Sequence, residues 1–345
     1  MKQIFFLTIV LFLFACSKNE IKIGPAINES KMLDINGTKQ FVMIKGENDK
    51  NPVLLHIHGG PGVSEIGGLR KYNKELEKSF TVVYWDQRNA GKSYQDGFPA
   101  SEIKLSKYIS DIDFLAKYIK TRLDVKKILV VGHSWGSQIG IIAAQKYPEH
   151  FSAFISTGQQ VAAYDGELQS YRYTLAKARE FGIDSLVQQL VFIGEPKSGD
   201  FRSMYNIPEG FSIQKYILLE LNRRIYNGFN LEQLFANFLE SDEYTAAEKE
   251  TYLIGAEFSN KHIENDPDYI NYDLRKEVKK LTIPVFFICG KYDYINPTPL
   301  AKSYFDLLSA PKKEFVMFEN SGHDPAWEEP SRYHNELKRI SKIVK

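Results

Sequence analysis

A serine within a tight glycine-flanked turn is the residue of this chain best suited to covalent chemistry. Residues 132–136 read Gly-His-Ser-Trp-Gly, a spacing in which small flanking residues let the backbone turn sharply and expose the serine hydroxyl. An apolar run at 128–131 precedes the turn and a helical pattern over 135–147 follows it. We therefore expect Ser134 to act as a nucleophile, the alternative being an ordinary strand-to-helix turn with an inert serine.

A serine hydroxyl becomes a good nucleophile only when a base removes its proton, so a histidine is required elsewhere. Where this turn carries a catalytic serine, the order along the chain is serine, acid, histidine. His323 lies in a loop after an expected strand at 313–318, where such a base belongs. His262 falls in a helical segment and His334 in the expected terminal helix, where a solvated face explains each of them. We predict His323 as the base.

The acid that orients the imidazole is expected at the end of the preceding strand. Asp293 directly follows the expected strand at 283–289, and the end of that strand faces the same sheet edge as the serine turn. Asp324, next to the histidine, is badly placed to reach the far ring nitrogen, and Asp165 at the start of a helical region is a further rival. We predict Asp293 as the orienting acid, the alternative being an exposed turn aspartate.

The oxygen that becomes negative when a serine attacks a carbonyl needs preorganised N–H donors. The amide of Trp135, directly after the serine, is one expected donor. The second is expected from residues 58–62, His-Gly-Gly-Pro-Gly, where the absence of side chains allows close approach of the backbone. A turn that merely needs glycine conformations is the alternative for this loop.

Apolar strand patterns alternate with helical patterns over two parts of the chain, which indicates a parallel sheet covered on both faces. Asn36-Gly37 between two strand-like runs at 33–44 predicts a hairpin. Strand signals disappear between about 161 and 275, where the spacing is helical. We expect a doubly wound α/β core over 31–160 and 276–345, interrupted by a helical cap over 161–275.

Taken together, these residues resemble the α/β-hydrolase fold and, within it, the proline iminopeptidase-like serine peptidases. The matching segments are the glycine loop at 58–62, Asp-Gln-Arg-Asn-Ala-Gly-Lys-Ser at 86–93, the serine turn at 132–136, and the acid and histidine segments at 290–293 and 322–323. The resemblance implies an α/β-hydrolase doubly wound, mostly parallel sheet with an inserted helical cap. It also implies the triad Ser134, Asp293 and His323, with the amides of Gly60 and Trp135 as the oxyanion hole.

The chain departs from the family pattern at several positions. Asn89 stands where the family has glycine, and Ser137 stands where a second glycine usually follows the serine turn. The family's cap is rich in tryptophan and carries a glutamate that holds the free amine of the substrate. The three tryptophans here, Trp85, Trp135 and Trp327, all lie outside the cap. Nothing in the sequence selects an amine ligand among Glu167, Glu180, Glu220 and Glu232, so this contact stays unassigned.

The N-terminus has the pattern of an export signal. Residues 1–15 are a short apolar run after a single lysine, and Leu-Phe-Ala before Cys16 resembles a bacterial lipobox. We expect cleavage before Cys16, acylation of its sulfur, a tether over 16–30, and a lipid-anchored protein on the periplasmic or extracellular face of a bacterial membrane. An ordinary secretory signal or a membrane-anchoring helix is the alternative.

The composition limits the kinds of partner and cofactor that we expect the protein to bind. The 345 residues hold 44 Lys and Arg against 43 Asp and Glu, so no basic field favours nucleic acid. The two cysteines, Cys16 and Cys289, form no zinc-type cluster, and no phosphate-binding glycine loop occurs. We expect neither metal nor cofactor, and the sequence does not set the oligomeric state.

Three functions fit these residues. The first is a serine hydrolase that releases a small N-terminal residue, such as proline, from a short peptide. The second keeps the mechanism but acts on a carboxylic ester or another small amide. The third is an inactive binding lipoprotein, against which the complete set of Ser134, Asp293 and His323 argues. Buried acidic groups in the cap pocket would favour the peptidase, since a cationic amine needs a counter-charge, and a purely apolar pocket would favour the esterase.

Overall fold

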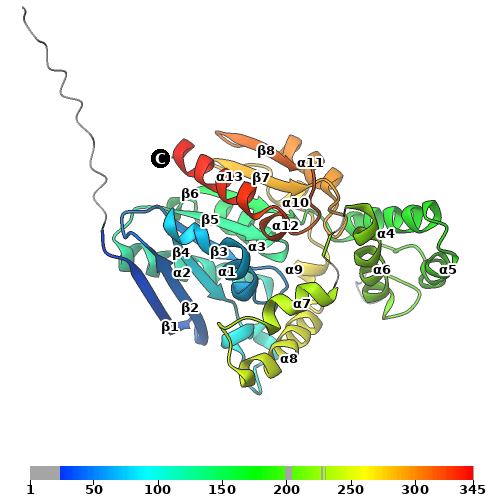
Figure 1. The fold of residues 1–345 in the computed structure, drawn as a ribbon, viewed down its shortest axis with the longest axis horizontal. Coiled ribbons are helices and arrows are strands. Elements are labelled where there is room, and N and C mark those ends of the chain that lie inside the picture. The colour runs from blue at the N-terminus through cyan, green and yellow to red at the C-terminus, as the bar shows by residue number, and fades with distance from the viewer. Residues whose placement is uncertain (1–23, 199–203, 227, 230, 345) are drawn as a thin grey trace, which may run out of the picture.

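The backbone is organised around one mixed sheet, seen in a computed structural model that describes residues 24–198, 204–226, 228–229 and 231–344 (Figure 1). In this part of the chain eight strands pair in the order β1-β2-β4-β3-β5-β6-β7-β8. The pairs β1–β2 and β2–β4 are antiparallel, and the pairs β4–β3, β3–β5, β5–β6, β6–β7 and β7–β8 are parallel. The strands are β1 (Ile27–Ile35), β2 (Thr38–Gly46), β3 (Val53–Ile57), β4 (Thr81–Asp86), β5 (Ile128–His133), β6 (Phe151–Thr157), β7 (Val285–Gly290) and β8 (Lys313–Phe318).

The predicted hairpin is confirmed, but it begins earlier than expected. Asn36 and Gly37 both have positive φ, 50° and 82°, as a two-residue turn that matches strand twist requires. β1 starts at Ile27 and pairs with β2 up to Gly46, so the expected tether over 16–30 is wrong for its last four residues. An edge strand is paired on one side only and can be polar and exposed. β1 is largely exposed, so its polar composition resembles that of a linker.

Strands β3 to β7 bury both faces, which explains their apolar runs, whereas the edge strand β8 is only partly buried. In β5, Ile128 and Val130 pack into the core on one face, while Leu129 and Val131 pack on the other. The helices α2, α3 and α11 contribute to the first core, and α1 and α13 contribute to the second. The core helices are α1 (Ile66–Asn73), α2 (Leu105–Leu123), α3 (Trp135–Lys146), α11 (Thr298–Leu307), α12 (Pro325–Glu328) and α13 (Pro330–Ile343).

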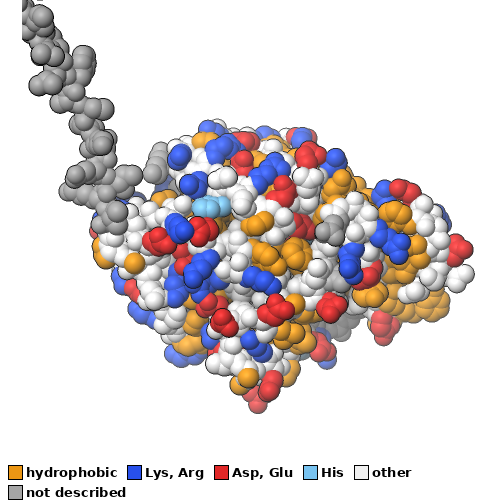
Figure 2. Space-filling model, viewed as in Figure 1, with side chains coloured by type: hydrophobic (Ala, Val, Ile, Leu, Met, Phe, Trp, Pro, Cys, Tyr) orange, Lys and Arg blue, Asp and Glu red, His pale blue; other side chains and the backbone are white. Residues whose placement is uncertain are grey.

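The helices between β6 and β7 form two separate packing groups. The first three share their own small apolar core around Tyr171, Leu190 and Ile217, whereas α7 and α8 pack Phe238 and Tyr252 onto the core of the sheet. Figure 1 shows the first group as a lobe apart from the sheet, and Figure 2 shows hydrophobic side chains gathered over it. The helices of this region are α4 (Ala163–Glu180), α5 (Asp184–Ile193), α6 (Gly210–Ile225), α7 (Leu231–Leu239), α8 (Ala246–Ile263), α9 (Pro267–Ile270) and α10 (Leu274–Glu277).

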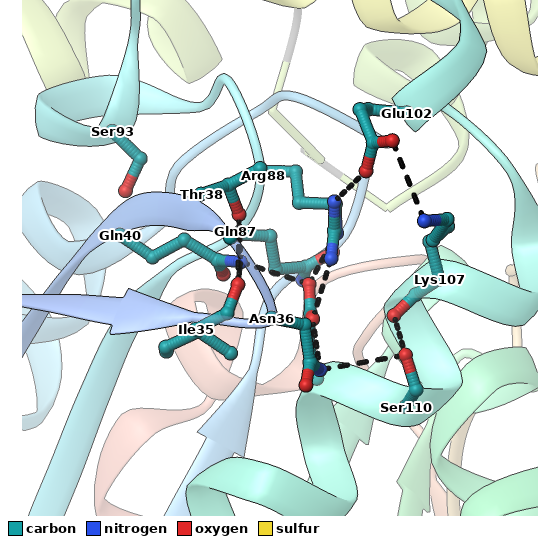
Figure 3. Close-up of polar contacts among 12 residues, drawn as sticks. Ile35, Asn36, Thr38, Gln40, Gln87, Arg88, Ser93, Glu102, Lys107 and Ser110 are labelled. Atoms are coloured by element: carbon teal, nitrogen blue, oxygen red, sulfur yellow. Dashed lines mark hydrogen bonds and ion pairs between the residues drawn. The ribbon is translucent and has the colours of Figure 1, made fainter.

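A fully buried ion pair joins the hairpin, the loop after β4 and α2. The guanidinium of Arg88 donates to both carboxylate oxygens of Asp111, through Nη2 at 2.7 Å and through Nε. Asn36 and Gln40 donate to the same carboxylate, each at 2.8 Å, and Glu102 accepts from the other end of the guanidinium at 2.7 Å. Figure 3 shows the side chain of Arg88 between Glu102 on one side and Asn36 and Gln40 on the other. Because every partner is satisfied, removing one member leaves an uncompensated buried charge.

We expect Asp111→Ala to lower the free energy of unfolding by about 3–5 kcal/mol, since Arg88 then stays buried without its counter-charge. Urea denaturation followed by circular dichroism measures the loss. Asp306→Ala, which removes an exposed partner of Lys302, is the matched control and should change stability by less than about 1 kcal/mol. Equal small losses in both variants would contradict the assignment.

Candidate active site

Ser134 occupies a strained turn between β5 and α3. Its φ of 52° and ψ of −119° lie outside the regions that a residue with a side chain normally adopts. Gly136 allows this turn, because a Cβ there would come within 2.7 Å of the carbonyl oxygen of His58. The serine is therefore presented at the carboxyl end of a central strand, the geometry expected of a nucleophile turn.

His323 and Asp293 meet at the ends of the two neighbouring strands, β8 and β7. The Nδ1 atom of His323 lies 2.9 Å from Oδ2 of Asp293. The other carboxylate oxygen, Oδ1, accepts the backbone N–H of Asn296 at 2.9 Å. Both side chains are buried, so the aspartate is fixed in orientation and in turn fixes the imidazole ring.

Ser134 and His323 lie on the wall of one cavity, but no hydrogen bond joins their side chains in the described structure. The side-chain amide of Asn296 connects Ser134 to Gly158: its Nδ2 donates to Gly158 O at 2.8 Å and to Ser134 Oγ at 3.4 Å. Gly158 in turn lies against the ring of His323, since a Cβ there would be 3.0 Å from Cε1. Such contacts often tighten only when substrate binds.

The loop expected to supply an oxyanion donor is held by a neutral histidine. His58 Nε2 accepts the N–H of Gln87 at 3.0 Å, so Nδ1 carries the proton and donates to Gly59 O at 2.7 Å. Burial lowers the pKa of His58 to about 4, which agrees with that tautomer. Gly60 lines the same cavity as Ser134, and Trp135 begins α3, where an N–H has no acceptor within the helix.

Glu65 is a buried carboxylate beside the nucleophile that sequence reasoning missed. Its Oε1 lies 2.6 Å from Nδ1 of His133 and accepts the N–H of Gly59 at 2.9 Å. Its Oε2 lies 2.8 Å from Nε2 of His56. Burial alone would raise the pKa of Glu65, but the two histidines outweigh it and hold the pKa well below its usual range. The low pKa favours the charged form of this carboxylate.

The cavity over Ser134 has a volume of about 230 Å³ and mixed walls. Its apolar side comes mainly from α7, α8 and Trp327 on α12, and its charged side from Glu65 and Asp324 in the loops that follow β3 and β8. Burial raises the pKa of Asp324, one of the two carboxylates in the wall. The lining residues are Gly59, Gly60, Val63, Ser64, Glu65, Gly68, His133, Ser134, Leu234, Phe235, Asn237, Phe238, Tyr252, His323, Asp324 and Trp327.

The second helix group is tied directly to the glycine loop. Tyr252 OH donates to Ser64 O at 3.1 Å, and Asn260 Nδ2 donates to Pro61 O at 3.1 Å. Tyr244 OH donates to the buried carboxylate of Asp86 at 3.2 Å. Helix α8 therefore sets both a wall of the cavity and the path of the loop that would bind an oxyanion.

The residues that were weighed against Asp293 and His323 in the sequence lie elsewhere or make other contacts. Asp324 Oδ1 is 3.6 Å from His133 Nε2, and Asp165 pairs with Arg275 at 2.5 Å. His334 lies on α13, where its Nε2 is 3.2 Å from Oγ of Ser79. His262 lies on α8.

The four cap glutamates are not equivalent. Glu167 is buried and pairs with Lys215 at 3.0 Å beside a smaller cavity of about 60 Å³. Glu180 and Glu232 are exposed and Glu220 is half-buried, and none of these three lines the cavity over Ser134.

Sequence signals for the missed residues exist but are weak. A histidine inside an apolar strand, as at His56, needs a buried polar partner, and Glu65 follows it at the end of the glycine loop. The amide of Asn296 and the exposure of Asp324 to the cavity gave no local signal, because both depend on how distant loops meet.

Comparison with known proteins places the chain in a family. Residues 52–330 match the family described as alpha/beta hydrolase fold, so the chain belongs to the α/β-hydrolase family and is a hydrolase of that superfamily; the predicted fold class is confirmed. It is 34% identical over 316 residues to the probable aminopeptidase YbaC of Bacillus subtilis (strain 168), covering 90% of this chain and 95% of that protein.

Two further proteins are similar over most of the chain. The proline iminopeptidase of Heyndrickxia coagulans is 24% identical over 305 residues, which cover 87% of this chain and 94% of that protein. The crystal structure of VinJ shares the fold with a TM-score of 0.64 and 15% identity, covering 93% of this chain and 100% of that chain.

We expect Ser134→Ala to abolish covalent labelling by a fluorophosphonate probe, because the oxygen that would bond to phosphorus is removed. In-gel fluorescence of purified protein measures the label. Ser137→Ala, which removes the next hydroxyl along α3, should still label. Persistent labelling of the Ser134 variant would move the nucleophile to another residue.

Proposed function

We propose that this protein is a serine hydrolase that releases a small N-terminal residue from short peptides through an acyl-enzyme. The contact between His323 Nδ1 and Asp293 Oδ2 at 2.9 Å carries this proposal. It leaves Nε2 of the imidazole as the proton-accepting nitrogen, on a ring that shares a cavity wall with Ser134. The similarity to an aminopeptidase over 90% of the chain supports the same reading.

Each step has a residue to perform it. His323 takes the proton of Ser134 as Oγ attacks the substrate carbonyl, and Asp293 stabilises the imidazolium that forms. The N–H groups of Gly60 and Trp135 bind the oxygen that becomes negative. The imidazolium then gives its proton to the leaving amine as the C–N bond breaks. Water attacks the acyl-enzyme with His323 again acting as base, and the imidazolium returns the proton to Ser134 Oγ as the bond to the acyl group breaks.

The charges in the cavity favour an amine-bearing substrate. Two carboxylates, Glu65 and Asp324, line the wall, and the imidazole of His133 lies near both. Glu65 Oε1 lies 2.6 Å from Nδ1 of His133, whereas Asp324 Oδ1 lies 3.6 Å from Nε2 of the same ring. Burial raises the pKa of Asp324. A substrate ammonium beside Asp324 would supply the missing positive charge, and we propose Asp324 as its partner.

An ester hydrolase of the same mechanism is the second candidate. It is favoured by the hydrophobic walls from Leu234, Phe235, Phe238 and Trp327, which suit an acyl chain without charge. An inactive binding protein is the third, and fluorophosphonate labelling of Ser134 would exclude it.

We expect Asp324→Asn to raise KM for a prolyl or alanyl arylamide by about 10- to 100-fold, the range of a lost hydrogen bond to a charged group. The substitution keeps the side-chain shape and removes only the charge. Steady-state kinetics with the free arylamide, its N-acetylated form and a short aryl ester measure the effect.

The N-acetylated amide and the ester are the internal controls, because neither carries an ammonium. Their KM values should change less than about threefold. Equal losses for all three substrates would contradict the amine contact, and ester turnover without any arylamide turnover would replace the peptidase by the esterase.

We also propose that Cys16 is lipidated and anchors the protein to a membrane. This prediction lies outside the described residues and rests on the sequence of residues 1–16. Within the described ranges, every helix is too short or too polar to cross a bilayer. Cells grown with labelled palmitate should yield a labelled protein, and Cys16→Ser should lose the label; a variant that kept it would refute the anchor.

A further inference from the structure

His133, the residue before the nucleophile, contacts an acceptor at each ring nitrogen. Nδ1 lies 2.6 Å from the Glu65 carboxylate and Nε2 lies 3.0 Å from the backbone carbonyl of His323. A carbonyl oxygen and an ionised carboxylate can accept hydrogen bonds but cannot donate them. With Glu65 ionised, a neutral imidazole, which has one N–H, could serve only one of these contacts, so both require the doubly protonated, positively charged ring.

The surroundings of His133 agree with a positive charge. Burial alone would lower the pKa of His133, but Glu65 and Asp324, together with the carbonyl of His323, raise it to about 10. The groups that face the ring are the Glu65 carboxylate before α1, the Asp324 carboxylate before α12 and the imidazole of His323, whose ring centre is 4.9 Å away. His56 on β3 reaches the same pair through Glu65.

The pair connects three segments that must keep fixed positions around the nucleophile. Glu65 binds the N–H of Gly59, at the start of the loop that bears Gly60. His133 binds the carbonyl of His323, and it is covalently joined to Ser134. One buried pair thus links the oxyanion loop, the serine turn and the histidine loop.

We propose that Glu65 and His133 form a permanent buried ion pair that positions Gly59-Gly60 and the backbone of His323 relative to Ser134. Neither residue needs to touch the reacting atoms, so both are positioning residues. The inference rests on the proposed function only for the roles of Gly60 and His323. The charge state of the pair is independent of the substrate and of whether the protein catalyses hydrolysis.

Nuclear magnetic resonance of protein labelled with ¹⁵N-histidine tests the charge directly. At pH 8.5 His133 should show two protonated ring nitrogens, and in Glu65→Gln it should be neutral. The signal is assigned by its loss in His133→Gln or, if that variant does not fold, in His133→Asn. A His133 with a single ring proton in the unmodified protein at this pH would overturn the proposal.

Kinetics test the positioning role. Glu65→Gln keeps the shape of the side chain, and it should lower kcat by about a hundredfold, the effect of displacing a reacting group by roughly 1 Å. KM should change less than about threefold, since the acyl group still contacts the same apolar walls. The rate of fluorophosphonate labelling should fall in parallel, whether arylamide or ester is the substrate.

The double variant Glu65→Gln/His133→Gln should be no slower than the slower single variant, because the two residues act as one unit. Asp113→Asn is the matched control, since Asp113 also pairs with a buried histidine, His150 at 2.9 Å, but on α2 away from the cavity. It should leave kcat unchanged. An unchanged kcat in Glu65→Gln, or an equal fall in the control, would overturn the positioning role.

The two proposals fail in different ways. If Ser134 never labels and no substrate is turned over, the proposed function is wrong, but doubly protonated His133 would still establish the ion pair. If labelling and turnover occur while His133 is neutral, the function stands and the ion pair does not.

Discussion

The carboxyl ends of parallel strands meet at one edge of a sheet, and this constraint sets the position of every group in the site. β3 leads into the glycine loop, β5 into Ser134, β7 into Asp293, and β8 into the loop with His323. Strands β3, β5 and β7 are buried on both faces and β8 pairs with β7 along its whole length, so the loops start from fixed points. Residues separated by 189 positions along the chain, Ser134 and His323, reach the wall of one cavity for this reason.

Rigid strands do not by themselves fix the loops, and buried charges do that here. Glu65, His133 and Asp324 are all buried beside the serine turn. Each charge costs solvation free energy, which is offset only where the partners are close and well oriented. Glu65 meets three donors within 2.9 Å, whereas Asp324 has a poorer match. The first arrangement suits a structural role, and the second suits a site that is completed by a cationic ligand.

Patterns that are local in the sequence predicted most of the fold. Strand and helix periods follow from which faces are buried, and the hairpin at Asn36-Gly37 follows from the positive φ that its turn requires. The contact of His323 with Asp293 was expected from chain order and strand ends, although their catalytic roles stay predictions. The start of β1 was missed because an exposed edge strand has the composition of a linker.

Features that depend on distant segments were not predictable in the same way. No local pattern shows that α4–α6 form their own core while α7 and α8 pack on the sheet. The pairing of Glu65 with His133 spans 68 positions, and the bridge from Asn296 to Ser134 spans 162. The amine ligand was sought among cap glutamates, while the carboxylates that line the cavity come from the core, at Glu65 and Asp324.

A crystal structure of the protein after reaction with a small fluorophosphonate tests the central claim most directly, which is the convergence of Ser134, His323 and the two amide donors. We predict phosphorus bonded to Ser134 Oγ, the phosphoryl oxygen within hydrogen-bond distance of the N–H groups of Gly60 and Trp135, and Nε2 of His323 turned toward the adduct. An adduct on another residue, or an imidazole of His323 that faces away from the phosphorus, would contradict it.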